Sequence, residues 1–423
     1  MMTWVRHSTT GAIGAAIGIA GVLLALHARR EGLNLWTDYI TGLSQASIYT
    51  GTLAAGVSAW EARRTHKPLV ARLLVSSRPV VAVRVAHFAS VAAPLALGFV
   101  IGVALLWAIG LATGVYGSPF IPWIGALVGA ILAASAFGYG VSAVSRNQWY
   151  SPPLAAILFF ASYVILQLLH APNWSRALFP VIMNVDSEFV AHVSTTMFGQ
   201  IVAYLSFVIL VPVLIAVAAK RRRGPSGFIL VATLIAGVGL GASLIGLRNG
   251  QYVTGQNPGD FVCEGARPQV CVNPGYRAGL AKLVTAFAEL SQKSSDSDLI
   301  ASRLEQQVEG IGDSPTRPAR SLYIEDLSES GIAFSVARYV DRYGGGIACR
   351  TSEHTYDQHL ANAVVQAWLS NFDELGFGGA SPMEPGAAEF RRLTALGPVA
   401  ARSWFGNHVR QYMSCGLTLA DLP

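Results

Sequence analysis

Long apolar stretches separated by short polar ones make up the first 250 or so residues. A helix rises about 1.5 Å per residue, so roughly 20 apolar residues are needed to cross about 30 Å of hydrocarbon. Seven stretches reach this length, at about residues 9–27, 40–60, 85–112, 120–143, 152–170, 197–219 and 226–247. The pattern predicts seven membrane-spanning helices, of which the second is the most polar because Ser44, Gln45 and Thr50 interrupt it.

Shorter and more amphipathic patterns follow from residue 248 onward. Residues 261–272 contain short β-prone pieces, and residues 321–327 read as a strand. Apolar positions recur at helical spacing in residues 276–290, 332–342, 354–375, 385–396 and 398–414. Such spacing indicates amphipathic helices. The predicted fold class is therefore a membrane all-α bundle followed by a small α+β domain.

Composition and charge agree with this division. The chain is 52% hydrophobic and only 13% charged, with a mean hydropathy of +0.45. Residues 1–247 carry 15 Lys and Arg against 5 Asp and Glu, whereas the remainder carries 15 against 19. Because the positive excess lies between apolar stretches, we expect it to face anionic membrane lipids and not nucleic acid.

The distribution of basic residues predicts the orientation in a cell (plasma) membrane. Lys and Arg near the ends of spans favour the cytoplasmic side. A cytoplasmic N-terminus places twelve basic residues inside, from Arg6 through the run at 63–84 to the cluster at 220–223. Arg29 and Arg30 run against the rule. Seven spans then leave residues 248–423 outside the cytoplasm.

The cysteines indicate the same placement. All four lie after residue 248, at Cys263, Cys271, Cys349 and Cys415. An even number of cysteines confined to one domain is typical of disulfides in an oxidising compartment. Cys263 and Cys271 are near enough in sequence to close a short loop, which leaves Cys349 for Cys415, although three pairings are formally open.

A basic segment between the second and third apolar stretches is the most informative motif. Pro68 suits the first position of a helix, and Leu69, Leu73 and Leu74 then share one face, with Arg72 elsewhere. This pattern predicts a short amphipathic helix at the cytoplasmic surface, of a kind that docks into a groove on a partner protein. The alternative is a basic anchor that only fixes the orientation of the spans.

The string Glu61-x-Arg63-Arg64, followed by Leu73-Leu74-x-Ser-Ser-Arg78-Pro and a long apolar span, resembles the coupling-helix region of ABC-2 type permeases. The resemblance covers residues 1–223 and implies a six-helix core, a separate ABC ATPase subunit, and a permease homodimer or heterodimer. A seventh helix at 224–247 and an external domain at 248–423 depart from that plan. The coupling residues it implies are Glu61, Arg63, Arg64, Leu69, Arg72, Leu73, Leu74 and Arg78.

The sequence gives little support for ATP hydrolysis or metal binding by this chain. No Gly-x-x-x-x-Gly-Lys-Ser/Thr phosphate loop is present, so we expect ATP hydrolysis to come from the separate subunit and the chain itself to be neither an enzyme nor a cofactor protein. Glu353, His354, Asp357 and His359 cluster in sequence. On one helix, however, the two histidines would point about 140° apart, which argues against a metal site.

Three functions are consistent with these patterns. The favoured one is a permease that exports a hydrophobic or amphipathic compound, which the apolar, glycine-rich spans suit. Intramembrane Asp, Glu and Lys that an ion-coupled carrier would need are scarce, which argues against secondary transport. The second is a membrane-anchored ligand-binding or sensor protein that acts through its external domain. The third is an enzyme with its active site in that domain. Within the spans, Gly14/Gly18, Gly98/Gly102 and Gly125/Gly129 predict close helix packing.

Overall fold

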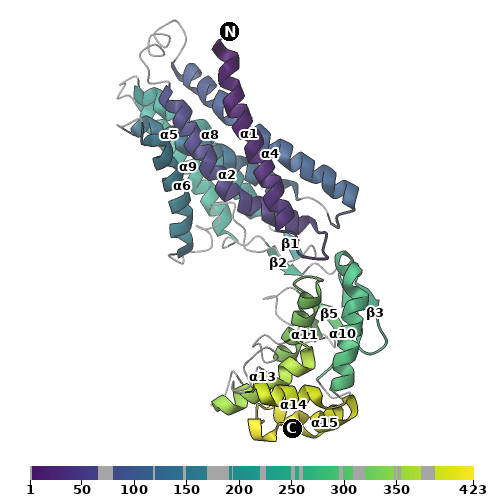
Figure 1. The fold of residues 1–423 in the computed structure, drawn as a ribbon. Coiled ribbons are helices and arrows are strands. Elements are labelled where there is room, and N and C mark those ends of the chain that lie inside the picture. The colour runs from purple at the N-terminus through teal and green to yellow at the C-terminus, as the bar shows by residue number, and fades with distance from the viewer. Residues whose placement is uncertain are drawn as a thin grey trace. The chain divides into compact units, whose positions relative to one another are not determined.

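The structure is a computed structural model, and it forms two compact units (Figure 1). Unit 1 comprises residues 1–29 and 35–255, and unit 2 comprises residues 30–34 and 256–423. The described residues are 2–64, 80–117, 120–145, 149–168, 190–192, 194–219, 225–248, 253–256, 261–294, 299–307, 320–346, 349, 354–372 and 386–423.

Unit 1 is a bundle of long helices. They are α1 (Met2–His27), α2 (Trp36–Arg64), α4 (Val80–Thr113), α5 (Ile121–Val144), α6 (Ser151–Leu168), α8 (Ser194–Ala219) and α9 (Pro225–Gly246). Helix α2 packs against α1, α4, α5 and α6, and α8 packs against α5 and α9. A two-stranded sheet joins β1 (Val190–His192) to β2 (Val253–Gln256).

Four of the described helices are long and apolar enough to cross a membrane. The qualifying segments are Thr10–His27, Val81–Thr113, Ile121–Ala143 and Ser194–Ile215. Two shorter apolar segments lie in α6 and α9, at Ser151–Ile165 and Ile235–Gly246. Large apolar side chains such as Leu97, Ile101 and Leu105 on α4 are exposed on the protein, as a lipid-facing surface requires. The seven-span count stays a prediction.

Helix α2 is not among these four segments, because its many hydroxyl groups make it too polar. Ser44, Thr50 and Thr52 donate hydrogen bonds to the carbonyls of Ile40, Ala46 and Ile48, at 2.8, 2.9 and 2.8 Å. Ser44 and Thr50 are almost fully buried. Because a hydroxyl bonded to its own helix needs no water, a polar sequence can occupy the centre of an apolar bundle.

Glycines bring α1 and α4 into backbone contact. A Cβ atom at Gly98 would overlap the carbonyl oxygen of Gly14, and one at Gly102 would lie 2.7 Å from the carbonyl oxygen of Gly18. The α2–α5 contact has the same feature, since a Cβ atom at Gly138 would overlap the Ala55 carbonyl. These contacts confirm the helix packing predicted from the Gly14/Gly18 and Gly98/Gly102 spacing.

Unit 2 is built on a four-stranded sheet in the order β3 (Val262–Glu264), β4 (Gln269–Val272), β5 (Arg303–Gln306) and β6 (Arg320–Leu322). Strands β3 and β4 form an antiparallel pair, whereas β4–β5 and β5–β6 are parallel. The turn η1 (Pro274–Gly279) and helix α10 (Leu280–Lys293) connect β4 to β5, as parallel pairing demands a crossover. Side chains of Leu283, Phe287 and Leu304 are fully buried.

Four further helices described in unit 2 lie at the periodic stretches predicted from the sequence. They are α11 (Glu329–Tyr343), α13 (Tyr356–Ser370), α14 (Ala387–Ala395) and α15 (Pro398–Met413), followed by the turn η2 (Leu419–Asp421). Helix α13 packs against α11, α14 and η2. Its first turn is fixed by a capping box, in which Thr355 and Gln358 exchange hydrogen bonds.

A short segment of the α1–α2 connection belongs to unit 2. The Leu327 N–H donates to the carbonyl of Glu31 at 2.9 Å, and Arg30 Nη1 donates to the Glu325 carbonyl at 3.3 Å. Gly32 adopts φ +73°, and a Cβ atom there would lie 2.7 Å from Leu327 Cβ. Residues 30–34 are therefore tied to the β6–α11 connection of their own unit.

Candidate functional site

The helix ends that flank residues 65–79 form the candidate site of unit 1. Helix α2 ends at Arg64 and α4 begins at Val80, so the predicted coupling segment connects them. Of the predicted coupling residues, Glu61, Arg63 and Arg64 lie on the last turn of α2. The others fall outside the described residues, namely Leu69, Arg72, Leu73, Leu74 and Arg78.

Glu61 and Arg64 form an ion pair on this last turn. The Arg64 Nη1 atom lies 3.0 Å from Glu61 Oε1 and donates a hydrogen bond to Oε2 at 3.2 Å. Glu61 is buried, whereas the Arg64 side chain is one-third exposed. Because the pair is spaced i, i+3, it holds the charges of both residues against one face of the helix end.

Arg63 points to a different set of partners. Its guanidinium carbon lies 3.5 Å from the ring centroid of Trp60 and 4.5 Å from that of Trp149, which precedes α6. The cation is attracted by the negative faces of both rings. Arg63 therefore links the end of α2 to the start of α6, and Trp149 remains 74% exposed beside it.

A buried polar group lies on the other flank of the segment. His87 Nδ1 of α4 is 3.2 Å from the Tyr139 hydroxyl of α5, and Phe88 contacts the Tyr139 ring edge-on at 5.5 Å. Arg84 is also buried and interacts with the Tyr139 hydroxyl. Burial of a charged group is unfavourable without such partners, so the arrangement fixes the first turns of α4 against α5.

One apolar cluster joins the two flanks. It consists of Ala62 of α2, Phe88 and Ala92 of α4, and Ala136 and Tyr139 of α5. Side chains of α8, including Val208 and Val211, pack against it. The two ends of the predicted coupling segment are thus anchored in the same packed group of helices.

Sequence reasoning missed the roles of Arg84, His87, Tyr139 and Trp149. Arg84 and His87 are spaced i, i+3 near the start of an otherwise apolar helix, and a charged residue in such a position was a usable signal. Tyr139 and Trp149 gave no comparable signal, because their partners come from other helices and only folding brings them together.

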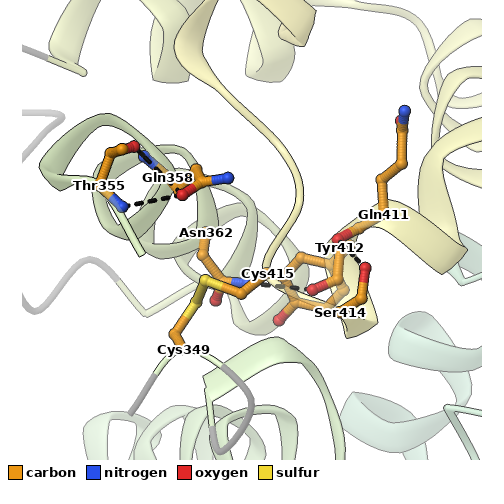
Figure 2. Close-up of a disulfide and its surroundings, with 8 residues drawn as sticks. All are labelled: Cys349, Thr355, Gln358, Asn362, Gln411, Tyr412, Ser414 and Cys415. Carbon is orange, nitrogen blue, oxygen red and sulfur yellow. Dashed lines mark hydrogen bonds between the residues drawn. A yellow bond between two sulfur atoms is a disulfide. The ribbon is translucent and has the colours of Figure 1, made fainter. Parts of the chain in front are cut away.

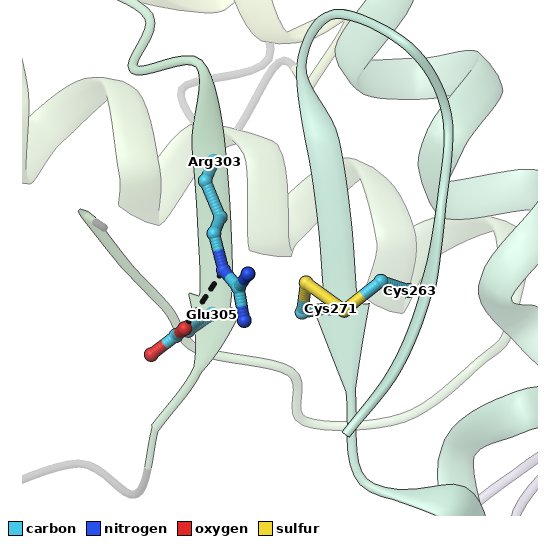
Figure 3. A network of polar contacts seen from close by, with 4 residues as sticks. All are labelled: Cys263, Cys271, Arg303 and Glu305. Atoms are coloured by element: carbon cyan, nitrogen blue, oxygen red, sulfur yellow. Dashed lines mark hydrogen bonds and ion pairs between the residues drawn. A yellow bond between two sulfur atoms is a disulfide. The ribbon is translucent and has the colours of Figure 1, made fainter. Parts of the chain in front are cut away.

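The two disulfides of unit 2 join the cysteine pairs that the loop lengths favoured. Cys263 and Cys271 are directly opposed on β3 and β4 and are bonded to each other. Figure 3 shows this disulfide near the ion pair in which Arg303 Nε donates to Glu305 Oε1 at 2.9 Å, on the neighbouring strand β5. Cys349 bonds to Cys415, which follows α15 (Figure 2).

The sequence pattern predicts His354 and His359 on one helix, and this geometry is wrong. His354 precedes the helix, whose N-cap is Thr355, so the 100° rotation per residue does not apply to it. Its ring centroid lies 6.3 Å from that of His359 in an edge-on contact. Asp357 accepts a hydrogen bond from the Leu419 N–H at 3.2 Å, and Glu353 falls outside the described residues.

Comparison with known proteins yields no match: no family model, no curated protein and no solved structure matches the chain.

Proposed function

We propose that the chain is the membrane-spanning permease subunit of an ABC transporter. In this proposal residues 61–78 receive the stroke of a separate ATPase subunit, and the spans move a hydrophobic or amphipathic compound outward. The observation that supports it most is the anchoring of both ends of the 65–79 segment in one packed cluster of α2, α4, α5 and α8.

Transmission of force requires such anchoring. A surface helix that a partner pushes can move the spans only if its flanking helices are firmly attached to them, because coupling travels through packed and hydrogen-bonded contacts. The Glu61–Arg64 pair stiffens the last turn of α2, and the contact of His87 with Tyr139 holds α4 against α5. A push on the segment would therefore reach four helices together.

The proposed topology has seven spans, a cytoplasmic N-terminus and an extracytoplasmic unit 2. Residues 30–34 belong to unit 2. In the proposed topology the connection between α1 and α2 is therefore extracytoplasmic, like the rest of that unit. The described helices between this connection and residue 256 are α2, α4, α5, α6, α8 and α9. If each crosses the membrane, the chain makes an even number of crossings and returns to the same side, which supports α2 as a span.

The contacts of Arg29 and Arg30 fit this orientation. Arg29 lies over the Tyr39 ring, 5.8 Å from its centroid, and Arg30 bonds to the Glu325 carbonyl. Two basic residues at the outer end of α1 run against the usual charge bias. Because both arginines have partners within the folded protein, these contacts explain why basic residues occur there despite the charge bias.

Co-purification tests the proposal. The full chain, solubilised in detergent from its native cells, is compared with the variant Glu61→Ala/Arg64→Ala. The matched control is Glu389→Ala/Arg392→Ala, which removes another i, i+3 Glu–Arg pair with a 2.9 Å contact, on α14 of unit 2. We expect a nucleotide-binding protein to co-purify with the wild type and the control, and to bind the first variant about tenfold more weakly, equivalent to roughly 1.4 kcal/mol.

Two results would contradict the proposal. Absence of any nucleotide-binding protein from the wild-type eluate would contradict the proposal that a separate ATPase drives transport. If both variants retained the nucleotide-binding protein equally, the Glu61–Arg64 pair would not contribute to ATPase binding.

A further inference from the structure

Three metal-ligating side chains meet at the second disulfide of unit 2. The sulfurs of Cys349 and Cys415 and a ring nitrogen of His359 all lie within 4.8 Å of one another. The two cysteines are buried and His359 is exposed, so the group opens to solvent on the side of the imidazole. Two sulfurs and one imidazole form a ligand set that holds Zn²⁺ with a fourth position open to water.

The position of Cys415 is set by the end of α15 and not only by its disulfide. The Cys415 N–H donates to the Tyr412 carbonyl at 3.1 Å, and the Gly416 N–H donates to the Gln411 carbonyl at 2.7 Å. Asn362 Nδ2 donates to the same Tyr412 carbonyl at 3.2 Å, as Figure 2 shows, and so ties α13 to this turn. None of these bonds involves a sulfur atom, so none requires the disulfide.

His359 is fixed in a similar way on the first turn of α13. Its N–H donates to the Thr355 carbonyl at 3.1 Å, and Thr355 and Gln358 form the capping box drawn in Figure 2. Two of the three ligands thus stand on helix ends held by backbone and capping hydrogen bonds. Preorganised ligands of this kind lower the cost of assembling a metal site.

The first disulfide lacks this arrangement. Cys263 and Cys271 face each other on adjacent strands, and in the described part of the chain no group of three potential ligands includes either of them. The same chain therefore contains one disulfide with a neighbouring imidazole ligand and one without, which serve as a matched pair.

We propose that, once reduced, Cys349 and Cys415 join His359 in a three-ligand site for Zn²⁺, so that the disulfide and the metal exclude each other. A dithiol reductant supplies two electrons and two protons to the S–S bond, gives the thiols of Cys349 and Cys415, and is itself oxidised to a disulfide. Zn²⁺ then displaces the two thiol protons and binds both thiolates and neutral His359, because metal ligands of these types bind in their deprotonated forms.

Zinc-dependent alkylation of the full-length protein tests this site. The protein is reduced, freed of reductant without air, mixed with one equivalent of Zn²⁺ or Mg²⁺, and labelled with a maleimide. Mass spectrometry then follows each cysteine separately. We expect Zn²⁺, and not Mg²⁺, to slow labelling of Cys349 and Cys415 at least about tenfold and to leave Cys263 and Cys271 unchanged.

Two histidine variants sharpen the test. His359→Ala removes a ligand and should weaken zinc protection by about tenfold or more, since even outer-shell partners contribute 10- to 100-fold to affinity. His354→Ala removes the neighbouring ring and should keep the protection. The proposal is overturned if all four cysteines react alike with and without Zn²⁺, if the Cys263 pair is protected equally, or if His359→Ala protects as well as the wild type.

Discussion

Units 1 and 2 are both rich in helix, but they differ in what they bury and what they expose. Unit 1 buries many small and hydroxyl-bearing residues, such as Ala54 and Ser44, beside large ones such as Trp123 and Phe99, and it exposes large apolar side chains over most of its helices. In the described part of unit 2, Tyr356 and Val399 are the large apolar side chains that are exposed, and two disulfides cross-link the chain.

The difference reflects the two solvents. Between lipid and protein there is little hydrophobic driving force, so close backbone contacts, such as that of Gly98 with Gly14, are expected to contribute to helix association in unit 1. Unit 2 also buries large apolar side chains, among them Leu283, Phe287 and Leu304, but it buries them away from water. Each unit should accordingly respond to a different kind of substitution.

The largest effect should come from the longer disulfide. Cys349 and Cys415 are 66 residues apart, and on the chain-entropy estimate their bond contributes about 4 kcal/mol, against about 2.5 kcal/mol for Cys263–Cys271, which spans 8 residues. We expect Cys349→Ala/Cys415→Ala to raise hydrogen exchange in α13 and α15 under oxidising conditions more than Cys263→Ala/Cys271→Ala does. A rise in exchange as large in unit 1 as in α13 and α15 would contradict the claim that this disulfide stabilises unit 2.

A glycine substitution in unit 1 should instead loosen unit 1 and leave unit 2 unaffected. Gly98→Leu places a side chain against the Gly14 backbone and should cost about 1–3 kcal/mol or more, as overpacking does. Gly11→Leu is the control, because a Cβ atom at Gly11 meets nothing within 4 Å. Thermal unfolding in detergent with hydrogen exchange should show α1 and α4 loosened by the first substitution and unit 2 unaffected. Loosening by Gly11→Leu to the same extent would refute the packing argument.

A smaller effect should depend on pH through Lys293. Its ammonium donates to the Trp368 carbonyl at 2.5 Å and to Asn371 Oδ1 at 2.6 Å, and burial lowers its pKa from 10.5 to about 8. Between these values the unfolded chain binds the proton that the folded unit has lost, so stability rises with pH across this window. Unfolding of unit 2 at pH 8 and pH 10 should show the rise, and Lys293→Met should abolish it.

The smallest stability effect belongs to the Glu61–Arg64 pair. It is partly exposed and spaced i, i+3, so its loss should cost only about 0.5 kcal/mol. The same cost applies to Glu389 and Arg392 in unit 2. A midpoint shift in detergent that is much larger for Glu61→Ala/Arg64→Ala than for the unit 2 pair would show that the first pair maintains the fold.

Helices of both units were predictable because their hydrophobic spacing is local. The strand β5 was not predicted, since it is four residues long and only Leu304 and Gln306 of its side chains are buried, whereas Arg303 and Glu305 lie on the other side. Parallel pairing with β4 and β6 is what stabilises it. A segment of this kind has no signal apart from its partners.

The candidate site was predictable only in part. The motif around Glu61 located the end of α2, but the contacts of Arg63 with Trp149 and of His87 with Tyr139 join helices far apart in sequence. The histidine geometry near α13 failed because the helix begins after His354, so the rotation of 100° per residue does not relate His354 to His359.

Photo-crosslinking tests the central claim most directly. Benzoylphenylalanine replaces Trp149, which is 74% exposed beside Arg63, and in a second protein it replaces Tyr356 of unit 2, which is 75% exposed. After irradiation of native cells, adducts are identified by mass spectrometry. We predict that position 149 crosslinks to a nucleotide-binding protein and that position 356 does not. An adduct with such a protein at 356, or none at 149, would contradict a permease driven at this end of α2.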